Sequence, residues 1–300
     1  MKFRRYLPRK IKLIIQDIHY KIYGRKMPWS QLRFEIHLVD KCNLNCAGCL
    51  HFSPLCKETS ILSLNDYEND CKRISALTDG RIADIRFLGG EPLLHPNIVD
   101  LFAITRKYFP NRDELNNTGV IELVTNGILL PKQNDEFWIK CRDNYIRIVI
   151  SEYPITIELE TIKEKAKIFN VELKMYSNEI QYKATGSANQ WAKIPMDING
   201  LQDYRKSFFK CFLSGNCFQL VKGKIFKCAR IAYINYFNKT YNQNMKITEN
   251  DYIDIYKARD IDEILYSLST PASFCRYCKA DEITWDNKWK VSKMELNEYL

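Results

Sequence analysis

Three cysteines stand close together near the start of the chain, in a pattern typical of metal ligands. Cys42, Cys46 and Cys49 are separated by three and then by two residues. Thiolates are the usual protein ligands of 4Fe-4S clusters. Three thiolates leave one iron of such a cluster without a protein ligand, and an open coordination position is where chemistry can occur. A closed zinc site completed by His51 is the alternative for this group.

A second group of cysteines lies in the last third of the chain. Cys275 and Cys278 are two residues apart, and Cys228 follows a glycine-containing stretch. With Cys211 or Cys217 as a fourth member, the group could close a cluster or a zinc site without an outside ligand. Free buried thiols are the other interpretation. The remaining cysteines are isolated, and we interpret them as packing residues: Cys56, Cys71 and Cys141.

The chain holds eleven cysteines in 300 residues. Whether such cysteines form disulfides or stay as thiols and metal ligands depends on the redox conditions of the cellular compartment. No stretch reaches the roughly 18 apolar residues that a membrane span needs, and the basic N-terminus lacks the features of a secretory signal. We therefore expect a cytoplasmic protein. In a reducing cytoplasm, metal ligands and free thiols are more common than disulfides.

The positive charge is concentrated at the N-terminus. Residues 1–26 hold nine lysines and arginines and one aspartate, which accounts for eight of the nine net positive charges. This distribution argues against nucleic acid as a partner. Isoleucines recur at helical spacing within it, so we predict a basic amphipathic helix over residues 1–29. The helix could contact an anionic membrane surface peripherally or bind an acidic partner, or it could pack against the domain with its charges in water.

Strands and helices are predicted to alternate through the first two thirds of the chain. Apolar runs typical of strands are interrupted by amphipathic segments typical of helices. Such alternation predicts an α/β fold whose parallel strands are joined by helical crossovers. The predicted strands cover residues 32–38, 83–88, 120–124, 145–150 and 171–176, and the predicted helices cover residues 64–77, 98–108, 135–141 and 158–168.

Polar and glycine residues follow these strands one after another. The cysteine triplet follows the first strand, Gly89-Gly90-Glu91-Pro92 the second, Thr125-Asn126 the third and Ser151 the fourth. In barrels and partial barrels the active site lies at the carboxyl ends of parallel strands. We therefore expect one pocket to receive all of these residues.

These motifs together resemble the radical S-adenosylmethionine superfamily, over residues 30–155. The run from Cys42 to Cys49 matches the family's CxxxCxxC signature, and residues 89–92 resemble its GGEP motif, which binds the amino group of the methionine moiety. Thr125-Asn126 and Ser151 stand where the family places polar contacts to the ribose and carboxylate of the cofactor. The resemblance implies a partial (β/α)6 TIM-like barrel of parallel strands with a small C-terminal α+β cysteine-rich domain.

Two positions depart from the family pattern, and one of them is the Ser151-Glu152-Tyr153 stretch, where the family has a recurrent Asp-Gly. At the other, the family usually carries an aromatic residue before the third cysteine, where this chain has Gly48. We expect His51 or Phe52 to take over the contact with adenine, although His51 could equally serve as a hydrogen-bonding residue behind the site.

The C-terminal cysteines resemble those of the twitch domain, a shortened SPASM domain that holds one auxiliary 4Fe-4S cluster. The spacing from Cys211 to Gly223 fits the family pattern and that from Cys217 does not, so Cys211 is the predicted first ligand and Cys217 the alternative. Three parts are therefore predicted: the N-terminal helix over residues 1–29, the radical S-adenosylmethionine core over 30–205 and the auxiliary-cluster domain over 206–300.

The resemblance implies an enzyme in which a reduced 4Fe-4S cluster cleaves S-adenosylmethionine and the resulting radical abstracts a hydrogen atom from substrate. A flavodoxin-like or ferredoxin-like protein would supply the electron. We expect oxidation or epimerisation of a carbohydrate-like small molecule or glycan, since twitch-bearing relatives include enzymes that oxidise an aminocyclitol alcohol. A peptide maturase is the alternative, but it would carry an extra N-terminal domain where only about 30 residues precede the first strand. A non-catalytic iron–sulfur or zinc protein is the third hypothesis.

Overall fold

An eight-stranded sheet forms the centre of the molecule. The computed structural model describes residues 32–110, 113, 118–176 and 190–300, so the predicted N-terminal helix lies outside the described residues. Five strands are parallel and stand in the order β5-β4-β3-β2-β1. Their bounds are Arg33–His37 for β1, Asp84–Leu88 for β2, Val120–Thr125 for β3, Ile146–Ser151 for β4 and Leu173–Tyr176 for β5.

Helices connect these strands, as the alternation predicts. Two of them begin at residues whose side chains accept a backbone N–H of the first turn, namely Ser63 before α2 and Asn134 before α4, which satisfies donors that a helix start otherwise leaves free. The helices are α2 (Leu64–Thr78), α3 (Ile98–Tyr108), α4 (Asp135–Asp143) and α5 (Leu159–Ile168).

The sheet continues with strands from the C-terminal part of the chain. β7 (Gln219–Val221) pairs parallel with β1, and β8 (Lys224–Phe226) and β9 (Tyr252–Asp254) follow in antiparallel pairs. β6 (Gln190–Lys193) and β10 (Thr284–Lys288) form a separate two-stranded antiparallel sheet. The α/β class is confirmed. The sixth parallel strand of the sheet, β7, comes from beyond residue 205 and lies beside β1, not beside β5.

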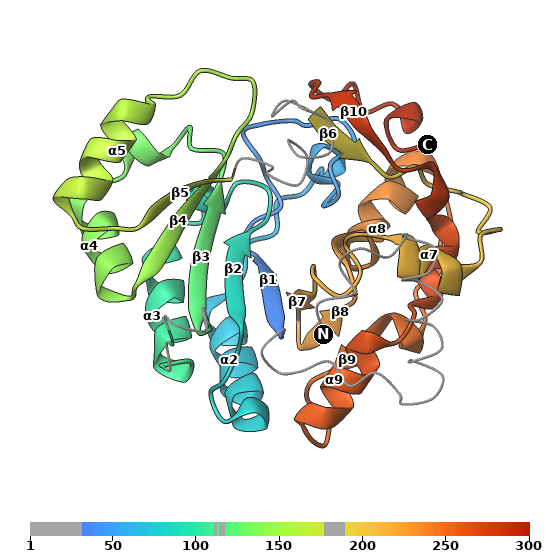
Figure 1. Ribbon diagram of the computed structural model, residues 1–300, viewed down its shortest axis with the longest axis horizontal. Helices are drawn as coiled ribbons and strands as arrows, with labels where there is room; N and C mark the ends of the chain where they lie inside the picture. The colour runs from blue at the N-terminus through green and yellow to red at the C-terminus, as the bar shows by residue number, and fades with distance from the viewer. Residues whose placement is uncertain (1–31, 111–112, 114–117, 177–189) are drawn as a thin grey trace, which may run out of the picture.

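Three longer helices belong to the C-terminal part, which Figure 1 shows to the right of the parallel strands. They are α7 (Tyr204–Lys210), α8 (Ala229–Tyr241) and α9 (Ile261–Ser269). Short 3-10 helices complete the described structure: η3 (Ser53–Leu55), η4 (Pro92–Leu94), η5 (Leu130–Lys132), η6 (Glu249–Asp251), η7 (Ser273–Tyr277), η8 (Ala280–Glu282) and η9 (Leu296–Glu298).

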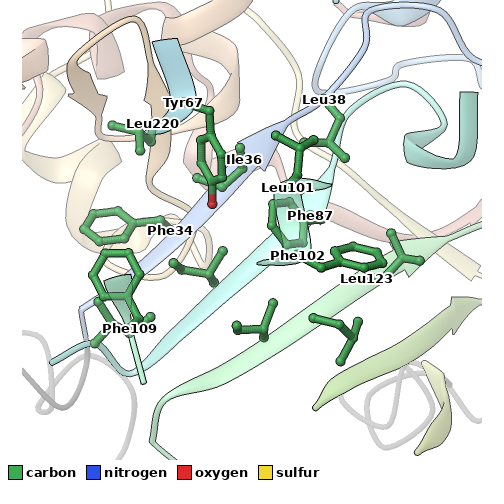
Figure 2. Close-up of a cluster of buried hydrophobic side chains, with 14 of the residues drawn as sticks. Phe34, Ile36, Leu38, Tyr67, Phe87, Leu101, Phe102, Phe109, Leu123 and Leu220 are labelled. Carbon is green, nitrogen blue, oxygen red and sulfur yellow. The ribbon is translucent and has the colours of Figure 1, made fainter. Parts of the chain in front are cut away.

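One face of the sheet is apolar and packs against α2, α3 and α4. Side chains alternate between the two faces of a strand, so Phe34, Ile36 and Leu38 of β1 point to the same side. Figure 2 shows them grouped with Phe87 of β2 and Phe102 of α3. A second core surrounds α8 and joins Phe52 and Leu55 to residues of the C-terminal part as far as Tyr299. Both cores draw on residues from either side of position 205, and the proposed domain boundary there stays a prediction.

The opposite face of the sheet carries a row of polar and charged residues. In the strand register, Gln219, Glu35, Arg86, Glu122 and Arg147 stand opposite one another on five adjacent strands. The carboxylate of Glu122 forms ion pairs with two arginines, since its oxygens lie 3.0 Å from Nε of Arg86 and 3.1 Å from Nη1 of Arg147. Opposite charges on neighbouring strands stabilise such a row. The sheet therefore has one apolar and one charged face.

Candidate active site

The three N-terminal cysteines lie on one loop directly after β1, here called the cluster loop (residues 40–52). Burial, with smaller contributions from Glu91, Cys46 and Cys49, raises the pKa of Cys42 to about 12, although the backbone N–H of Leu44, which lies 3.4 Å from the sulfur, opposes the rise. Burial likewise raises the pKa of Cys46 to about 11. Buried thiols this close together ionise only if positive charge is supplied, and cluster iron supplies it. The donor set therefore fits a 4Fe-4S cluster.

The geometry of this loop does not favour the alternative of a closed zinc site completed by His51. Within the described ranges, no group of three or more His, Cys, Asp or Glu side chains converges as on a single metal ion. His51 is turned into the protein, where its ring lies 5.4 Å from that of His37 and 5.5 Å from that of Tyr233, between centroids. A four-iron cluster spans more space than one ion, so its thiolates need not converge as tightly.

Gly89 and Gly90 hold the end of β2 against the cluster loop. A Cβ on Gly90 would lie 2.1 Å from the carbonyl oxygen of Lys41, and Gly89 has a φ of 146°, which side chains rarely permit. The backbone N–H of Gly90 donates to Val39 and that of Glu91 to Lys41. These glycines allow a close approach of backbone to backbone, which positions the chain immediately before Cys42.

Glu91 joins the loops after β2 and β3. Its buried carboxylate accepts the hydroxyl of Thr125 at 2.6 Å, the backbone N–H of Asn126 at 3.0 Å and that of Leu93 at 3.1 Å. Burial raises the pKa of Glu91, although these hydrogen bonds to its charged form oppose the rise. Pro92 starts the short helix η4, and the side chain of Glu91 caps that helix.

Asn126 connects this unit to the cluster loop itself. Its Nδ2 donates to Oδ1 of Asn43, between Cys42 and Cys46, at 2.7 Å. Ser151 ends β4 at the same edge of the sheet, in register with the last residue of β5. The structure thus brings the cysteine triplet, Glu91, Thr125 and Asn126 together, with Ser151 at the next strand end.

The positions expected to contact adenine have other surroundings. Gly48 has a φ of +68°, and a Cβ there would lie 3.1 Å from the carbonyl oxygen of Glu298. Phe52 is fully buried in the second core against Phe237 and Tyr299, so its ring exposes no surface to a ligand. Burial lowers the pKa of His51 to about 3, which keeps its imidazole neutral.

Asp40 links the cluster loop to α8. It accepts the hydroxyl of Tyr236 at 2.6 Å and the backbone N–H of Ser60 at 3.0 Å, and Nε2 of His37 lies 2.9 Å from its other oxygen. Burial alone would raise the pKa of Asp40, but the contacts with His37 and Tyr236 outweigh it, and the pKa is lowered. The carboxylate is charged and well placed to hold the loop on the helix.

Two aromatic residues that sequence reasoning missed lie against the cysteines. Trp289 donates its indole N–H to Sγ of Cys46 at 3.1 Å. The ring of Tyr153 lies 6.2 Å from that of Trp289, and burial followed by the three nearby thiols raises its pKa. Tyr153 is only two residues from Ser151 at the end of β4, so its position in the sequence could have indicated a place near the site. Trp289 is 243 residues from Cys46, and no local pattern connects them.

Four C-terminal cysteines line one pocket, together with Lys227 and Arg230. Burial, with smaller contributions from Cys278 and Cys211, raises the pKa of Cys228 to about 12. Nη1 of Arg230 donates to Sγ of Cys278 at 3.7 Å. The positive charges of Lys227 and Arg230 would therefore partly balance the negative charge of ionised thiols in this pocket. The cysteines that line the pocket are Cys211, Cys228, Cys275 and Cys278.

Cys217 lies in a different environment. Burial raises its pKa, and its strongest electrostatic neighbours are Glu35 and Arg86 of the charged face. Glu35 in turn interacts with Cys217 and with Gln219. The structure therefore places Cys211, and not Cys217, among the lining residues of the pocket that holds the other three thiols.

Comparison with known proteins finds one matching family model and several partly similar curated proteins. Residues 32–134 match the family model described as a 4Fe-4S single cluster domain. A GTP 3',8-cyclase of Clostridium perfringens (strain 13 / Type A) is 30% identical over 159 residues, 52% of this chain and 43% of that protein. The GTP 3',8-cyclase of Chlorobaculum tepidum is 35% identical over 113 residues, 38% of this chain and 30% of that protein. The chain spans less than half the length of these curated relatives.

Similar solved structures cover more of the chain at lower identity. BtrN in complex with AdoMet and 2-DOIA is 14% identical with a TM-score of 0.49, over 85% of this chain and 94% of BtrN. Native anSMEcpe with bound AdoMet is 14% identical with a TM-score of 0.46, over 83% of each chain. Streptococcus suis SuiB bound to precursor peptide SuiA is 12% identical with a TM-score of 0.39, over 85% and 68%.

Sequence motifs, loop geometry and family match point in one direction. The matched residues 32–134 contain the cysteine triplet, the glycine pair, Glu91 and the Thr125-Asn126 turn. The matched family model is described by a 4Fe-4S cluster, and AdoMet is bound in the structures of BtrN and anSMEcpe. Over residues 32–134, the chain therefore matches a 4Fe-4S single cluster domain and resembles the radical S-adenosylmethionine superfamily.

Proposed function

We propose that this protein is an enzyme that reductively cleaves S-adenosylmethionine at a cluster held by Cys42, Cys46 and Cys49, and then oxidises or epimerises a polar small molecule. The observation that supports this proposal best is that hydrogen bonds join the loops after β1, β2 and β3. They join Asn43 to Asn126 and Asn126 to Glu91. When bound, the reduced cluster and its cofactor supply a radical that removes a hydrogen atom from substrate.

The chain's own residues position that chemistry. Glu91 and Asn126 hold the loops after β2 and β3 against the cluster loop. Tyr153 and Trp289 flank the thiols with aromatic surface. Prepositioned groups and a site shielded from water are the main contributions a protein makes to cofactor chemistry.

An auxiliary 4Fe-4S cluster is proposed for the second group of thiols, with Cys211, Cys228, Cys275 and Cys278 as ligands. They line one buried pocket, and four thiolates complete a cluster without an outside ligand. Arg230 would lower the cost of burying the negative charge, because its guanidinium reaches Cys278. Lys227 lines the same pocket.

A polar, carbohydrate-like substrate is supported by the charged face of the sheet. Glu35, Arg86, Glu122 and Arg147 stand on the face opposite the apolar core, a surface suited to hydroxyl groups and not to apolar side chains. GTP, named for the relatives, is likewise a polar molecule that contains a sugar. A peptide substrate remains the competing proposal.

Iron content and 5′-deoxyadenosine release test the enzymatic proposal. We expect about eight irons per chain in anaerobically reconstituted protein and about four in a Cys42→Ala/Cys46→Ala/Cys49→Ala variant, with cofactor cleavage lost in the variant. Cys56→Ala serves as the control, because this thiol donates to the backbone of Glu58 outside both groups and should leave iron and cleavage unchanged. A fully loaded wild type that releases no 5′-deoxyadenosine with reductant and candidate substrates would contradict the proposal.

Deuterium transfer distinguishes the substrate classes. A sugar or aminocyclitol deuterated at the reacting carbon should pass deuterium to 5′-deoxyadenosine, and deuterated peptides should not. The isotope content of the nucleoside, measured by mass spectrometry, decides between them. Transfer from peptides alone would replace the carbohydrate proposal with that of a peptide maturase.

A further inference from the structure

The C-terminal segment of the chain is bound directly to the cluster loop. Here it is called the C-terminal clamp, residues 289–298. The carbonyl of Lys290 accepts the backbone N–H of Ala47 at 2.9 Å, and the backbone N–H of Ser292 donates to Asn45 at 2.8 Å. Between these bonds, Val291 and Cys46 form an antiparallel bridge. The clamp therefore pairs with the loop like a short strand, and the paired residue is a thiol ligand.

Further contacts hold the clamp in one conformation. The carboxylate of Glu298 accepts the hydroxyl of Ser292 and the backbone N–H of Lys293. Its carbonyl lies against Gly48, where a Cβ would be 3.1 Å away. The next residue, Tyr299, is buried in the second core. Because both ends of the clamp are anchored, the direction of the Trp289 side chain is defined.

In this conformation Trp289 donates a hydrogen bond to Cys46, one of the proposed cluster ligands. Its indole N–H lies 3.1 Å from Sγ of Cys46, and Tyr153 interacts with the same sulfur. Indole nitrogen can only donate. Hydrogen bonds to cluster sulfurs tune the reduction potential, because they stabilise the more negative reduced state.

We infer that Trp289 is a positioning residue that raises the reduction potential of the catalytic cluster through its N–H bond to Cys46. This inference rests on the proposed function only in requiring a cluster at Cys42, Cys46 and Cys49. It also gives the C-terminal clamp a role, since the clamp carries the donor to the sulfur. An electron donor would then reduce the cluster more easily than in a chain without this bond.

A redox titration of Trp289→Phe tests the inference. Phenylalanine keeps an aromatic ring but removes the N–H. We expect unchanged iron content and a reduction potential of the catalytic cluster that is shifted to more negative values. The titration is monitored by electron paramagnetic resonance, using the cluster signal that changes when S-adenosylmethionine is added. Trp285→Phe is the matched control: Trp285 is on β10 against Phe212, with ring centroids 4.8 Å apart, and its loss should leave that potential unchanged.

The outcomes separate this inference from the proposed function. If wild type shows no reducible cluster that responds to S-adenosylmethionine, the proposed function fails and the inference falls with it. If wild type shows that cluster and Trp289→Phe has the same potential, or is folded but has lost the catalytic iron, only the inference is overturned.

A measurement on the wild-type chain covers the case in which the variant does not fold. Protein containing tryptophan labelled with ¹⁵N in the indole ring should show, in pulsed electron paramagnetic resonance, a weak ¹⁵N coupling to the reduced catalytic cluster. Its absence would overturn the inference, because an N–H bonded to a ligand sulfur must sense the unpaired spin.

Discussion

Among single residues, Glu35 has its acid–base properties changed strongly by the fold. The carboxyl lies on β1 within the charged face of the sheet. Burial raises its pKa from an ordinary 4.5 to about 7, opposed by Arg86 and by the hydrogen bond from Gln219. The folded state therefore binds this proton more tightly than the unfolded state, and the protein is stabilised by protonation of Glu35 at low pH.

Glu35→Gln should remove a pH dependence of stability. The contribution of Glu35 is fully present below its unfolded pKa of 4.5 and is lost as the pH rises toward about 7, a loss of at most about 3 kcal/mol. We expect the variant to be more stable than wild type by about 1–3 kcal/mol at about pH 8 and to have no such gain at about pH 5, measured by urea unfolding of the anaerobic apo-protein.

Glu164→Gln, on the exposed side of α5, is the control and should not change the free energy of unfolding at either pH. A gain for Glu35→Gln that is equal at both pH values would show that the carboxyl does not titrate in this range, and would contradict the argument.

At the scale of elements, the turn after β2 determines where the cluster loop sits. Gly90 leaves no room for a side chain, because the backbone of Lys41 occupies the space. The glycine pair is therefore part of the interface between two loops. The sequence predicts that both loops line one pocket, but it does not predict the direct contact between their backbones, which joins residues about fifty positions apart.

Gly90→Ala should displace the cluster loop. The added Cβ would overlap the Lys41 carbonyl at 2.1 Å, so one backbone must move. We expect reconstituted iron to fall from about eight to about four per chain, with the auxiliary cluster retained. Gly215→Ala is the control: its φ of +80° makes a substitution strain the backbone there, but the added Cβ would meet nothing within 4 Å. Full iron content in Gly90→Ala would show that the loop tolerates the shift.

The predicted strands and helices agree with the observed ones within a few residues. The predicted strand over 145–150 is β4, Ile146–Ser151, and the predicted helix over 98–108 is α3, Ile98–Tyr108. These elements have clear periodicity because each packs one face on the core. The short strands β7, β8 and β9 were missed. Each has only three residues, and their pairing partners, not their own pattern, make them strands.

At the scale of the whole molecule, the two groups of thiols lie in different parts of one continuous structure. The cluster loop follows β1, and β7, which pairs with β1, leads through β8 to Cys228. The described residues include no helix that is both long and apolar enough to cross a membrane. The sheet connects the two proposed cluster sites without a separate linker.

Single cysteine variants test which thiols complete the second site. We expect Cys211→Ala to lose about four irons per chain and Cys217→Ala to lose none. Cys211 lines the pocket with the other three cysteines, whereas Cys217 interacts with Glu35 and Arg86. Iron analysis with 5′-deoxyadenosine release checks this, and cleavage should persist in Cys217→Ala. The reverse pattern of iron loss would make Cys217 the ligand.

The sequence by itself determined the cysteine triplet, the alternation of strands and helices, and the polar residues at the strand ends. Spacing and periodicity are local properties, and a chain displays them before it folds. Only the tertiary structure decided that β7 joins the sheet beside β1, that Cys211 shares a pocket with three distant thiols, and that Trp289 reaches Cys46. These features depend on contacts between residues far apart in the chain, which packing of the whole molecule brings together and no local pattern records.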